Sequence, residues 1–490
     1  MKKITTKQAA KGAKGQLVSG TGERQIGSVV IDSRQADESA LFVAIKGEHQ
    51  DGHIFADAAA KQGCRMFLLS REDVISQIRE IYPDAEIICV DNTVTGLQEL
   101  SRRYLAQFSI IKVAVTGSTG KTSTKEMVAA VLSRKYTTVK NEGNLNNELG
   151  LPLTIFKVDD STEAAVFEMG MSSFGEIHLL ADLVRPDMAV ITNVGTSHIE
   201  FLKTRENIMK AKMEIADFFD AKNTLIVNSD NEYLGLSAIS RYVAERHKED
   251  PSYKGDFKLV TAGEIGTQTV NLFNIDDLGE EGITFEIGCK GERQEFKLPL
   301  PGRHNAQNAI LAAAAGLQCG VPLKDAARAL RSMASTSRRL VIEPVKGMKL
   351  IDDSYNSSPD SVAAGVDVLK HVSGQRKVAI LADILELGEQ SEELHRLTGK
   401  FAARGGAQVL IACGTEAKFM AEGALDWLKS QEEEGTAPAV EVLYFAEREE
   451  LQKQLPELLR EGDVVLVKGS NGMKMSLVAE QIRAMAGEDA

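Results

Sequence analysis

Short apolar runs alternate with amphipathic stretches along most of this chain. Apolar runs of about four to eight residues indicate buried strands, and apolar positions spaced about three or four apart indicate helices. The alternation predicts an α/β protein whose sheets are mainly parallel and covered by helices. Because the alternation restarts along the chain, we expect three domains, spanning residues 1–107, 108–335 and 336–490.

Each segment has its own expected elements. In the first, the pattern predicts strands at 29–31, 40–45, 66–69 and 87–90 and a helix at 55–62. In the second, it predicts strands at 110–115, 164–167, 188–192 and 225–228, a strand-rich patch at 257–300, and helices at 123–133 and 305–318.

The third segment has the pattern of a Rossmann-like α/β domain. Its expected strands lie at 350–351, 378–381, 409–412, 442–445 and 464–467. A Gly-x-Gly-x-x-Gly motif does not follow the first of them, so we expect no nicotinamide cofactor.

Composition excludes several classes of protein. A length of 490 residues is too great for one hydrophobic core and agrees with three domains. The net charge of -13 argues against nucleic acid as a partner, because a phosphate backbone requires a basic surface. The sequence has no apolar run long enough for a membrane span, and we expect no signal peptide because no apolar stretch follows residues 1–7. The five cysteines are widely spaced without a Cys-x-x-Cys pair, which predicts reduced thiols in a cytoplasmic protein.

A glycine-rich loop follows the first expected strand of the second segment. It consists of Gly117, Ser118, Thr119, Gly120, Lys121 and Thr122. A strand, a glycine loop and a helix start place backbone amides and the helix dipole toward a phosphate, while Lys121 adds charge and Thr122 can bind Mg²⁺. Val115 stands where the first Gly of the usual Gly-x-x-x-x-Gly-Lys-Thr motif would be. The alternative is a glycine turn with a chance lysine, but the loop predicts a site for a nucleoside triphosphate.

Further polar residues follow the expected strands of the same segment. Glu168 ends the strand at 164–167, and His198 closes the loop after 188–192. Either residue alone could be a solvated charge or a hydrogen-bonded loop residue. Because strand ends gather at one edge of a parallel sheet, both together favour Mg²⁺ or phosphate binding. Lys210 and Lys212 lie on an expected helix, where a lysine is normally a surface charge.

Seven motifs occur in the order found in the Mur ligases, ATP-dependent enzymes that form amide bonds in peptidoglycan precursor synthesis. The motifs are 116–122, 144–148, 168–170, 193–198, 211–215, 301–308 and 352–356. The chain resembles this family from Asp32 to Ser470, nearly its whole length. The stretches 143–152 and 350–356 are similar to the family member that adds D-alanyl-D-alanine to UDP-N-acetylmuramoyl-tripeptide. The resemblance implies an acyl phosphate route that releases ADP and phosphate.

The resemblance also implies roles for individual residues. It implies that Lys121, His198 and Lys212 are catalytic, that Lys212 is carbamylated by CO₂, and that Thr122, Glu168, His198 and Lys212 hold Mg²⁺. ATP would contact the glycine loop. It would also contact residues from later in the chain: His304, Asn305, Asn308, Arg339, Asp353, Tyr355 and Asn356. Substrate would contact Ser33, Arg34, Lys46, Asn144, Asn146 and Asn147, with the first domain binding the UDP end.

Some assignments stay open. Arg338 is an alternative to Arg339, and Lys210 is an alternative to Lys212 with a poorer motif match. His304, Asn305 and Asn308 could also cap the alanine-rich helix. We expect the third domain to bind the amine substrate and to close over ATP about a hinge near 332–337, and we expect a monomer.

Two other functions compete with this reading. One is another carboxylate–amine ligase, either an earlier Mur ligase or a folylpolyglutamate synthetase-like enzyme. The other is a phosphate-loop switch protein, but the chain lacks the Asn-Lys dipeptide typical of guanine recognition.

Overall fold

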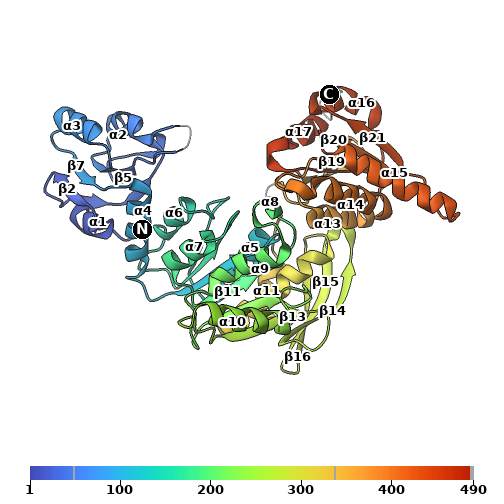
Figure 1. Ribbon diagram of the computed structural model, residues 1–490, viewed down its shortest axis with the longest axis horizontal. Helices are drawn as coiled ribbons and strands as arrows, with labels where there is room; N and C mark the ends of the chain where they lie inside the picture. Colours follow the sequence, from blue (N-terminus) through green and yellow to red (C-terminus); the bar gives the residue numbers. More distant parts are fainter. Residues whose placement is uncertain (48–49, 336–337, 486–490) are drawn as a thin grey trace.

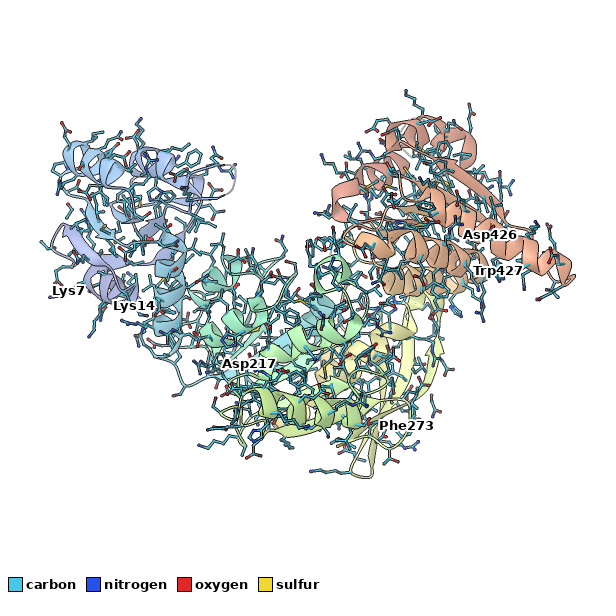
Figure 2. The ribbon with its side chains drawn as sticks, in the orientation of Figure 1. Lys7, Lys14, Asp217, Phe273, Asp426 and Trp427 are labelled. Atoms are coloured by element: carbon cyan, nitrogen blue, oxygen red, sulfur yellow. The ribbon has the colours of Figure 1, made fainter. Side chains whose placement is uncertain are left out.

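Each of the three segments contains a β-sheet of its own in the computed structural model, which describes residues 1–47, 50–335 and 338–485. The three domains follow one another around an open arc, with the N-terminal and C-terminal domains at its two ends and the central domain between them (Figure 1). Labelled side chains in Figure 2 mark the domains: Lys7 and Lys14 in the first, Asp217 and Phe273 in the second, Asp426 and Trp427 in the third.

The N-terminal domain has a five-stranded sheet in the order β2-β7-β6-β5-β4, parallel except for β2, and a small β1-β3 ladder. Its strands are β1 (Ile4–Thr5), β2 (Gln16–Ser19), β3 (Gln25–Ile26), β4 (Ser28–Val30), β5 (Ala40–Val43), β6 (Met66–Leu69) and β7 (Glu86–Cys89). Its helices are α1 (Thr6–Gly12), η1 (Ser33–Gln35), η2 (Gly52–Phe55), α2 (Ala56–Lys61), α3 (Glu72–Ile81) and α4 (Thr93–Leu105). The four expected strands and the helix near 55–62 are confirmed within a few residues.

The central domain is built on a nine-stranded sheet, β16-β15-β14-β13-β12-β11-β8-β10-β9, in which only the pairings of β15 and β16 are antiparallel. Its strands are β8 (Ile111–Thr116), β9 (Thr138–Lys140), β10 (Ala164–Glu168), β11 (Met188–Ile191), β12 (Thr224–Asn228), β13 (Lys258–Gly263), β14 (Val270–Asp277), β15 (Ile283–Cys289) and β16 (Glu292–Leu298). Its helices are α5 (Lys121–Leu132), α6 (Gly150–Ile155), α7 (Glu176–Val184), α8 (Ile199–Leu202), α9 (Arg205–Met213), η3 (Glu214–Ala216), α10 (Leu236–Glu249), η4 (Gly279–Glu281), α11 (Arg303–Gln318) and α12 (Leu323–Leu330).

Helices cover both faces of the central sheet, so both faces are buried. Successive side chains of a strand point to opposite faces and therefore enter different apolar clusters. Val113 and Val115 of β8 pack in one apolar cluster with residues of α5, α11 and α12. Ala114 packs in a second cluster with residues of α7 and α9. The apolar run at 110–115 corresponds to the central strand β8. The strand-rich patch at 257–300 corresponds to strands β13 to β16.

The C-terminal domain has a six-stranded sheet in the order β17-β18-β22-β19-β20-β21, in which only β17 is antiparallel. Its strands are β17 (Val341–Val345), β18 (Met348–Asp353), β19 (Arg376–Ala382), β20 (Val409–Cys413), β21 (Glu441–Phe445) and β22 (Asp463–Lys468). Its helices are α13 (Pro359–His371), η5 (Gly388–Gln390), α14 (Ser391–Arg404), α15 (Lys418–Glu433), α16 (Arg448–Leu458), η6 (Asn471–Met473) and α17 (Ser476–Ala484). The expected Rossmann-like architecture is confirmed. Of the expected hinge, residues 336–337 lie outside the described part of the chain.

Candidate active site

A cavity of about 750 Å³ lies where the carboxyl ends of the central strands meet the C-terminal domain. Strand β8 pairs in parallel with β10 and β11, and β11 with β12, so their ends share one edge of the sheet. The cavity brings together most of the residues expected in the site: Ser118, Thr119, Gly120, Lys121, Thr122, Asn144, Asn146, Asn147, Glu168, His198, His304, Asn305, Asn308, Arg339, Asp353, Tyr355 and Asn356. Gly117, Lys212, Ser33, Arg34 and Lys46 are not part of its lining.

The glycine loop needs its two glycines for steric reasons. Gly117 has a φ of 153°, and a Cβ there would lie 1.8 Å from Thr192 Oγ1. Gly120 has a φ of 75°, and a Cβ there would lie 2.6 Å from Asn308 Oδ1. Both positions therefore exclude any side chain, and the chain can turn from β8 directly into α5.

The loop amides are not all directed at the cavity. The amides of Ser118 and Thr119 donate to Asn193 Oδ1 at 3.0 and 2.9 Å. This differs from the expectation that the loop amides as a group face a phosphate. Helix α5 begins at Lys121, and the amides of its first turn have no acceptor within the helix. These amides are the backbone donors that stay available to an anion at the helix N-terminus, while Asn193 holds the loop in shape.

Lys121 lies at the first position of α5. Its Nζ donates to the carbonyl of Gly117 at 2.8 Å and to that of Ser118 at 3.3 Å. Burial lowers the pKa of Lys121, the charge of Glu168 opposes this change, and Arg339 adds to it. The amine is folded back over its own loop, at the place where phosphate oxygens would enter.

Glu168, at the end of β10, has one satisfied and one unsatisfied oxygen. Oε1 accepts from Thr122 Oγ1 at 3.2 Å and from Asn146 Nδ2 at 2.9 Å. Oε2 is buried and has no hydrogen-bond partner among the described residues, and Lys125 Nζ lies 3.6 Å away. A buried carboxylate oxygen next to a threonine hydroxyl is the hard oxygen donor set that Mg²⁺ prefers. The residues present therefore fit the metal that the sequence implied.

His198 meets a carboxylate from the other domain. It sits at a φ of 63° at the start of α8, and its Nδ1 pairs with Glu386 of the C-terminal domain. The amide of Glu200 donates to the carbonyl of Glu386 at 3.1 Å. His198 lowers the pKa of the Glu386 carboxyl by hydrogen bonding. Sequence reasoning missed Glu386, and an acidic residue in a loop gave no signal of its own.

Lys212 is buried on α9, with an exposed fraction of 1%. Burial lowers its pKa well below the ordinary value, and the charge of Lys121 lowers it further. In the described part of the chain no hydrogen bond or ion pair reaches its amine. Lys210, by contrast, is partly exposed and lies 4.0 Å from Glu245. A lowered pKa increases the uncharged fraction of an amine, and the uncharged amine is the form that reacts with CO₂.

The C-terminal domain contributes a second group of polar side chains. The guanidinium of Arg339 lies 4.1 Å from the centre of the Tyr355 ring, compared with 5.8 Å for Arg338, and only Arg339 lines the cavity. Lys468 Nζ lies 2.6 Å from Asp353 Oδ2 and donates to the carbonyl of Asn356 at 2.9 Å. Burial raises the pKa of Asp353, and Lys468 opposes this change. Lys468 was not predicted, although it ends the apolar run at 464–467.

The start of α11 forms another wall of the cavity. Its N-cap is Gly302, and Asn305 Nδ2 donates to the carbonyl of Pro301 at 2.8 Å. Asn308 Oδ1 accepts from Thr124 Oγ1 at 3.2 Å. These contacts do not cap the helix, so the capping alternative is wrong. Burial lowers the pKa of His304 to about 4, which leaves the ring neutral at pH 7.

The expected substrate residues of the N-terminal domain lie apart from this cavity. Ser33 begins η1, and Arg34 pairs with Asp32 at 2.6 Å with 86% of its side chain exposed. Hydrogen bonds from Arg34 lower the pKa of Asp32 to about 2. The backbone of Lys46 forms an isolated antiparallel β-bridge with that of Asp51. Their assignment to substrate stays a prediction.

Comparison with known proteins gives matches along the chain. Residues 25–105 match the Mur ligase family catalytic domain, 115–316 the Mur ligase middle domain, and 337–471 the Mur ligase glutamate ligase domain. The chain is 35% identical over 487 residues to UDP-N-acetylmuramoyl-tripeptide–D-alanyl-D-alanine ligase of Bacillus subtilis, covering 98% of this chain and 99% of that protein. It is 32% identical to the ligase of the same name from Escherichia coli, covering 94% and 93% of the two chains.

Solved structures agree with these matches. A crystal structure of MurF from Acinetobacter baumannii superposes with a TM-score of 0.85 at 28% identity, covering 98% of this chain and 99% of that one. MurF from Thermotoga maritima in complex with ADP superposes with a TM-score of 0.76 at 28% identity, covering 94% and 98%. Over the described residues, no helix has the length and apolar character needed to cross a membrane.

Proposed function

The chain belongs to the Mur ligase family, and we propose that it joins D-alanyl-D-alanine to UDP-N-acetylmuramoyl-tripeptide with conversion of ATP to ADP and phosphate. The observation that carries this proposal is the match, over nearly the full length of both chains, to ligases of that name. The cavity between two domains supports it, because it presents cationic, carboxylate and amide side chains to one space.

The chemistry explains the need for ATP. A carboxylate is a poor acyl donor, so its oxygen attacks the γ-phosphorus of ATP and ADP leaves, giving an acyl phosphate. The dipeptide amine then attacks the acyl carbon through a tetrahedral intermediate, phosphate leaves, and the amine loses its proton. In our proposal Lys121, His198 and the α5 amides stabilise the negative charge on phosphate and acyl oxygens.

The metal would be held by the buried carboxylate of Glu168 and the hydroxyl of Thr122, together with His198 and a carbamylated Lys212. Bound Mg²⁺ supplies positive charge next to the phosphate oxygens. Thr122 and Asn146 orient the carboxylate through its other oxygen. Lys125 lies close enough to balance part of its charge.

We also propose that the domains divide the work. Residues 1–107 would bind the UDP end through Ser33, Arg34 and Lys46, and residues 108–335 would bind ATP. Residues 336–490 would bind the amine substrate and close over ATP, which would keep water from the acyl phosphate. We further propose that the protein acts as a monomer. Free cysteines and nucleotide substrates support a cytoplasmic location.

The direct test is phosphate release from ATP with a panel of UDP-muramoyl peptides and amine donors. We expect turnover to require both a UDP-muramoyl-tripeptide and D-alanyl-D-alanine. Turnover with an amino acid in place of the dipeptide would indicate an earlier Mur ligase. Nucleotide binding without turnover on any pair would favour the phosphate-loop switch protein.

The contact between His198 and Glu386 leads to a further prediction. Glu386→Gln removes the charge that orients the ring, so we expect the Mg²⁺ concentration for half-maximal activity to rise about tenfold. The unfolding temperature should hardly change, because Glu386 is half exposed. Glu389→Gln, an exposed neighbour on η5, is the matched control. An identical Mg²⁺ dependence in both variants would show that Glu386 does not position His198.

A further inference from the structure

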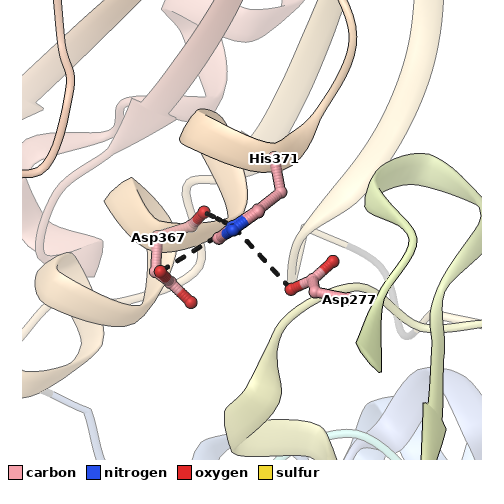
Figure 3. Close-up of side chains that lie close together, drawn as sticks. All are labelled: Asp277, Asp367 and His371. Atoms are coloured by element: carbon pink, nitrogen blue, oxygen red, sulfur yellow. Dashed lines mark hydrogen bonds and ion pairs between the residues drawn. The ribbon is translucent and has the colours of Figure 1, made fainter. Parts of the chain in front are cut away.

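Three potential metal ligands meet between the central and C-terminal domains, outside the cavity lining (Figure 3). Asp277 is the last residue of β14, and Asp367 and His371 lie four residues apart on α13. His371 Nδ1 lies 3.9 Å from Asp277 Oδ2 and 3.8 Å from Asp367 Oδ1. One potential ligand atom from each residue lies within 4.8 Å of the other two.

Asp277 presents a buried oxygen to this cluster. Its side chain is 6% exposed, and its Oδ1 accepts from the amide of Gly279 at 2.9 Å. Its Oδ2 is buried without a hydrogen-bond partner in the described part of the chain and points toward His371. Because a buried carboxylate oxygen without a partner is unfavourable, this position calls for a cation. The imidazole at 3.9 Å lies too far away to supply a hydrogen bond.

The other two ligands are free to adjust. His371 Nδ1 donates to the carbonyl of Asp367 at 2.8 Å, and it would have to release this bond and its proton to coordinate a metal. The side chains of His371 and Asp367 are 36% and 42% exposed, so both can rotate and water can enter. Ligands of a tetrahedral ion with bonds of about 2.0–2.1 Å lie about 3.4 Å apart. The two separations from His371 Nδ1 therefore need to shorten by about half an ångström. The separation between the two carboxylate oxygens, which is within 4.8 Å, needs to shorten by no more than about 1.4 Å.

The surrounding charges permit a cation here. The cluster lies at the C-terminal end of α13, where the helix dipole favours positive charge. The nearby carboxylate of Glu280 is already paired with Lys349 at 2.5 Å and with Ser373 Oγ at 2.6 Å. Two carboxylates remain beside a single imidazole, which leaves a net negative site when the imidazole is neutral.

We propose that Asp277, Asp367 and His371 bind a divalent transition-metal ion of the Zn²⁺ type that links the central and C-terminal domains. One imidazole and two carboxylates, with water as the fourth ligand, form a donor set that suits Zn²⁺. The N-terminal end of the same helix lines the cavity through Ser358, Asp360 and Ser361. A metal at the far end would hold α13, and with it the C-terminal domain, against β14.

The test uses the full chain, stripped of metal by a chelator and titrated with Zn²⁺ against a chromogenic chelator in excess Mg²⁺. We expect His371→Ala and Asp277→Asn each to weaken one Zn²⁺ site by at least about tenfold. His247→Ala is the matched control, because its Nδ1 also contacts a backbone carbonyl, that of Tyr253 at 3.0 Å. His178→Ala tests another pairing of a histidine with a carboxylate, that with Asp217.

Thermal unfolding gives a second readout that does not depend on activity. Zn²⁺ should raise the unfolding temperature of the wild type and of His247→Ala, but not of His371→Ala, because a ligand that binds only the folded state stabilises it. Equal Zn²⁺ affinities and equal temperature shifts in wild type and His371→Ala would overturn the proposal. Loss of the site in His178→Ala with retention in His371→Ala would overturn it too.

Discussion

Lys121→Ala is expected to abolish ligase activity while the protein stays folded. The amine of Lys121, the first residue of α5, is one of the few positive charges that line the cavity. We propose that it stabilises negative charge on the transferred phosphoryl group. Loss of one such preorganised donor reduces the rate by at least about 100- to 1,000-fold. The substitution removes two hydrogen bonds to loop carbonyls but no apolar core volume, so the loss of stability should be about 1–2 kcal/mol.

Phosphate release with both substrates and thermal unfolding together check this result. Lys135→Ala is the matched control: Lys135 Nζ also donates to two backbone carbonyls, those of Cys319 and Gly320, but lies outside the cavity. The control should retain nearly full activity. Normal ATP turnover by folded Lys121→Ala would rule out the assignment of the loop to phosphate.

The strand-end argument predicted much of the site. Glu168 and His198 were singled out because each follows an apolar run, and the parallel pairing of β8 with β10 and β11 brings both to one edge. The alternation of short apolar runs with helices is typical of a parallel sheet, in which the carboxyl ends of the strands share one edge, so this part of the geometry was accessible from the sequence. Strands β14 to β16, which lie at one end of the central sheet, were harder to predict. The sequence indicated only a strand-rich patch over residues 257–300 and did not give the bounds or order of these strands.

Contacts between distant segments could not be predicted in the same way. Asn193 Oδ1 shapes the glycine loop by accepting hydrogen bonds from the amides of Ser118 and Thr119, which lie 75 and 74 residues earlier in the chain. The motif 193–198 marked this loop, but nothing in it shows which residues the asparagine contacts. Glu386 and Lys468 come from a different domain from the phosphate loop. Their positions depend on domain docking, which no local periodicity records.

The two lysines of α9 show what helical geometry adds to a motif. Residues two apart on a helix lie about 200° apart around its axis, so Lys210 and Lys212 must face different ways. Ile208, Ala211 and Ile215 are buried on the side of Lys212. The sequence therefore contained the information that Lys212 faces the core, whereas its carbamylation followed only from the resemblance.

Lys212→Ala is expected to be inactive, and small carboxylates such as formate or acetate should partly restore its activity. In our proposal the neutral amine of Lys212 attacks CO₂, a C–N bond forms, and a proton is released, which leaves a carbamate anion as a metal ligand. Burial favours this reaction, because it lowers the pKa of the lysine and so raises the fraction of the amine that is uncharged. An added carboxylate can supply the missing oxygen anion in the space left by the truncated lysine side chain.

Lys210→Ala is the control, since Lys210 lies on the same helix, is partly exposed and faces Glu245. It should keep most of its activity and should not respond to formate. Removal of dissolved CO₂ should lower wild-type activity, and bicarbonate should restore it, while acidic mass spectrometry is unsuitable because carbamates decompose in acid. An unmodified Lys212 amine far from any metal, in a crystal grown near neutral pH with nucleotide bound, would refute the carbamate. Full activity of Lys212→Ala without any added carboxylate would do the same.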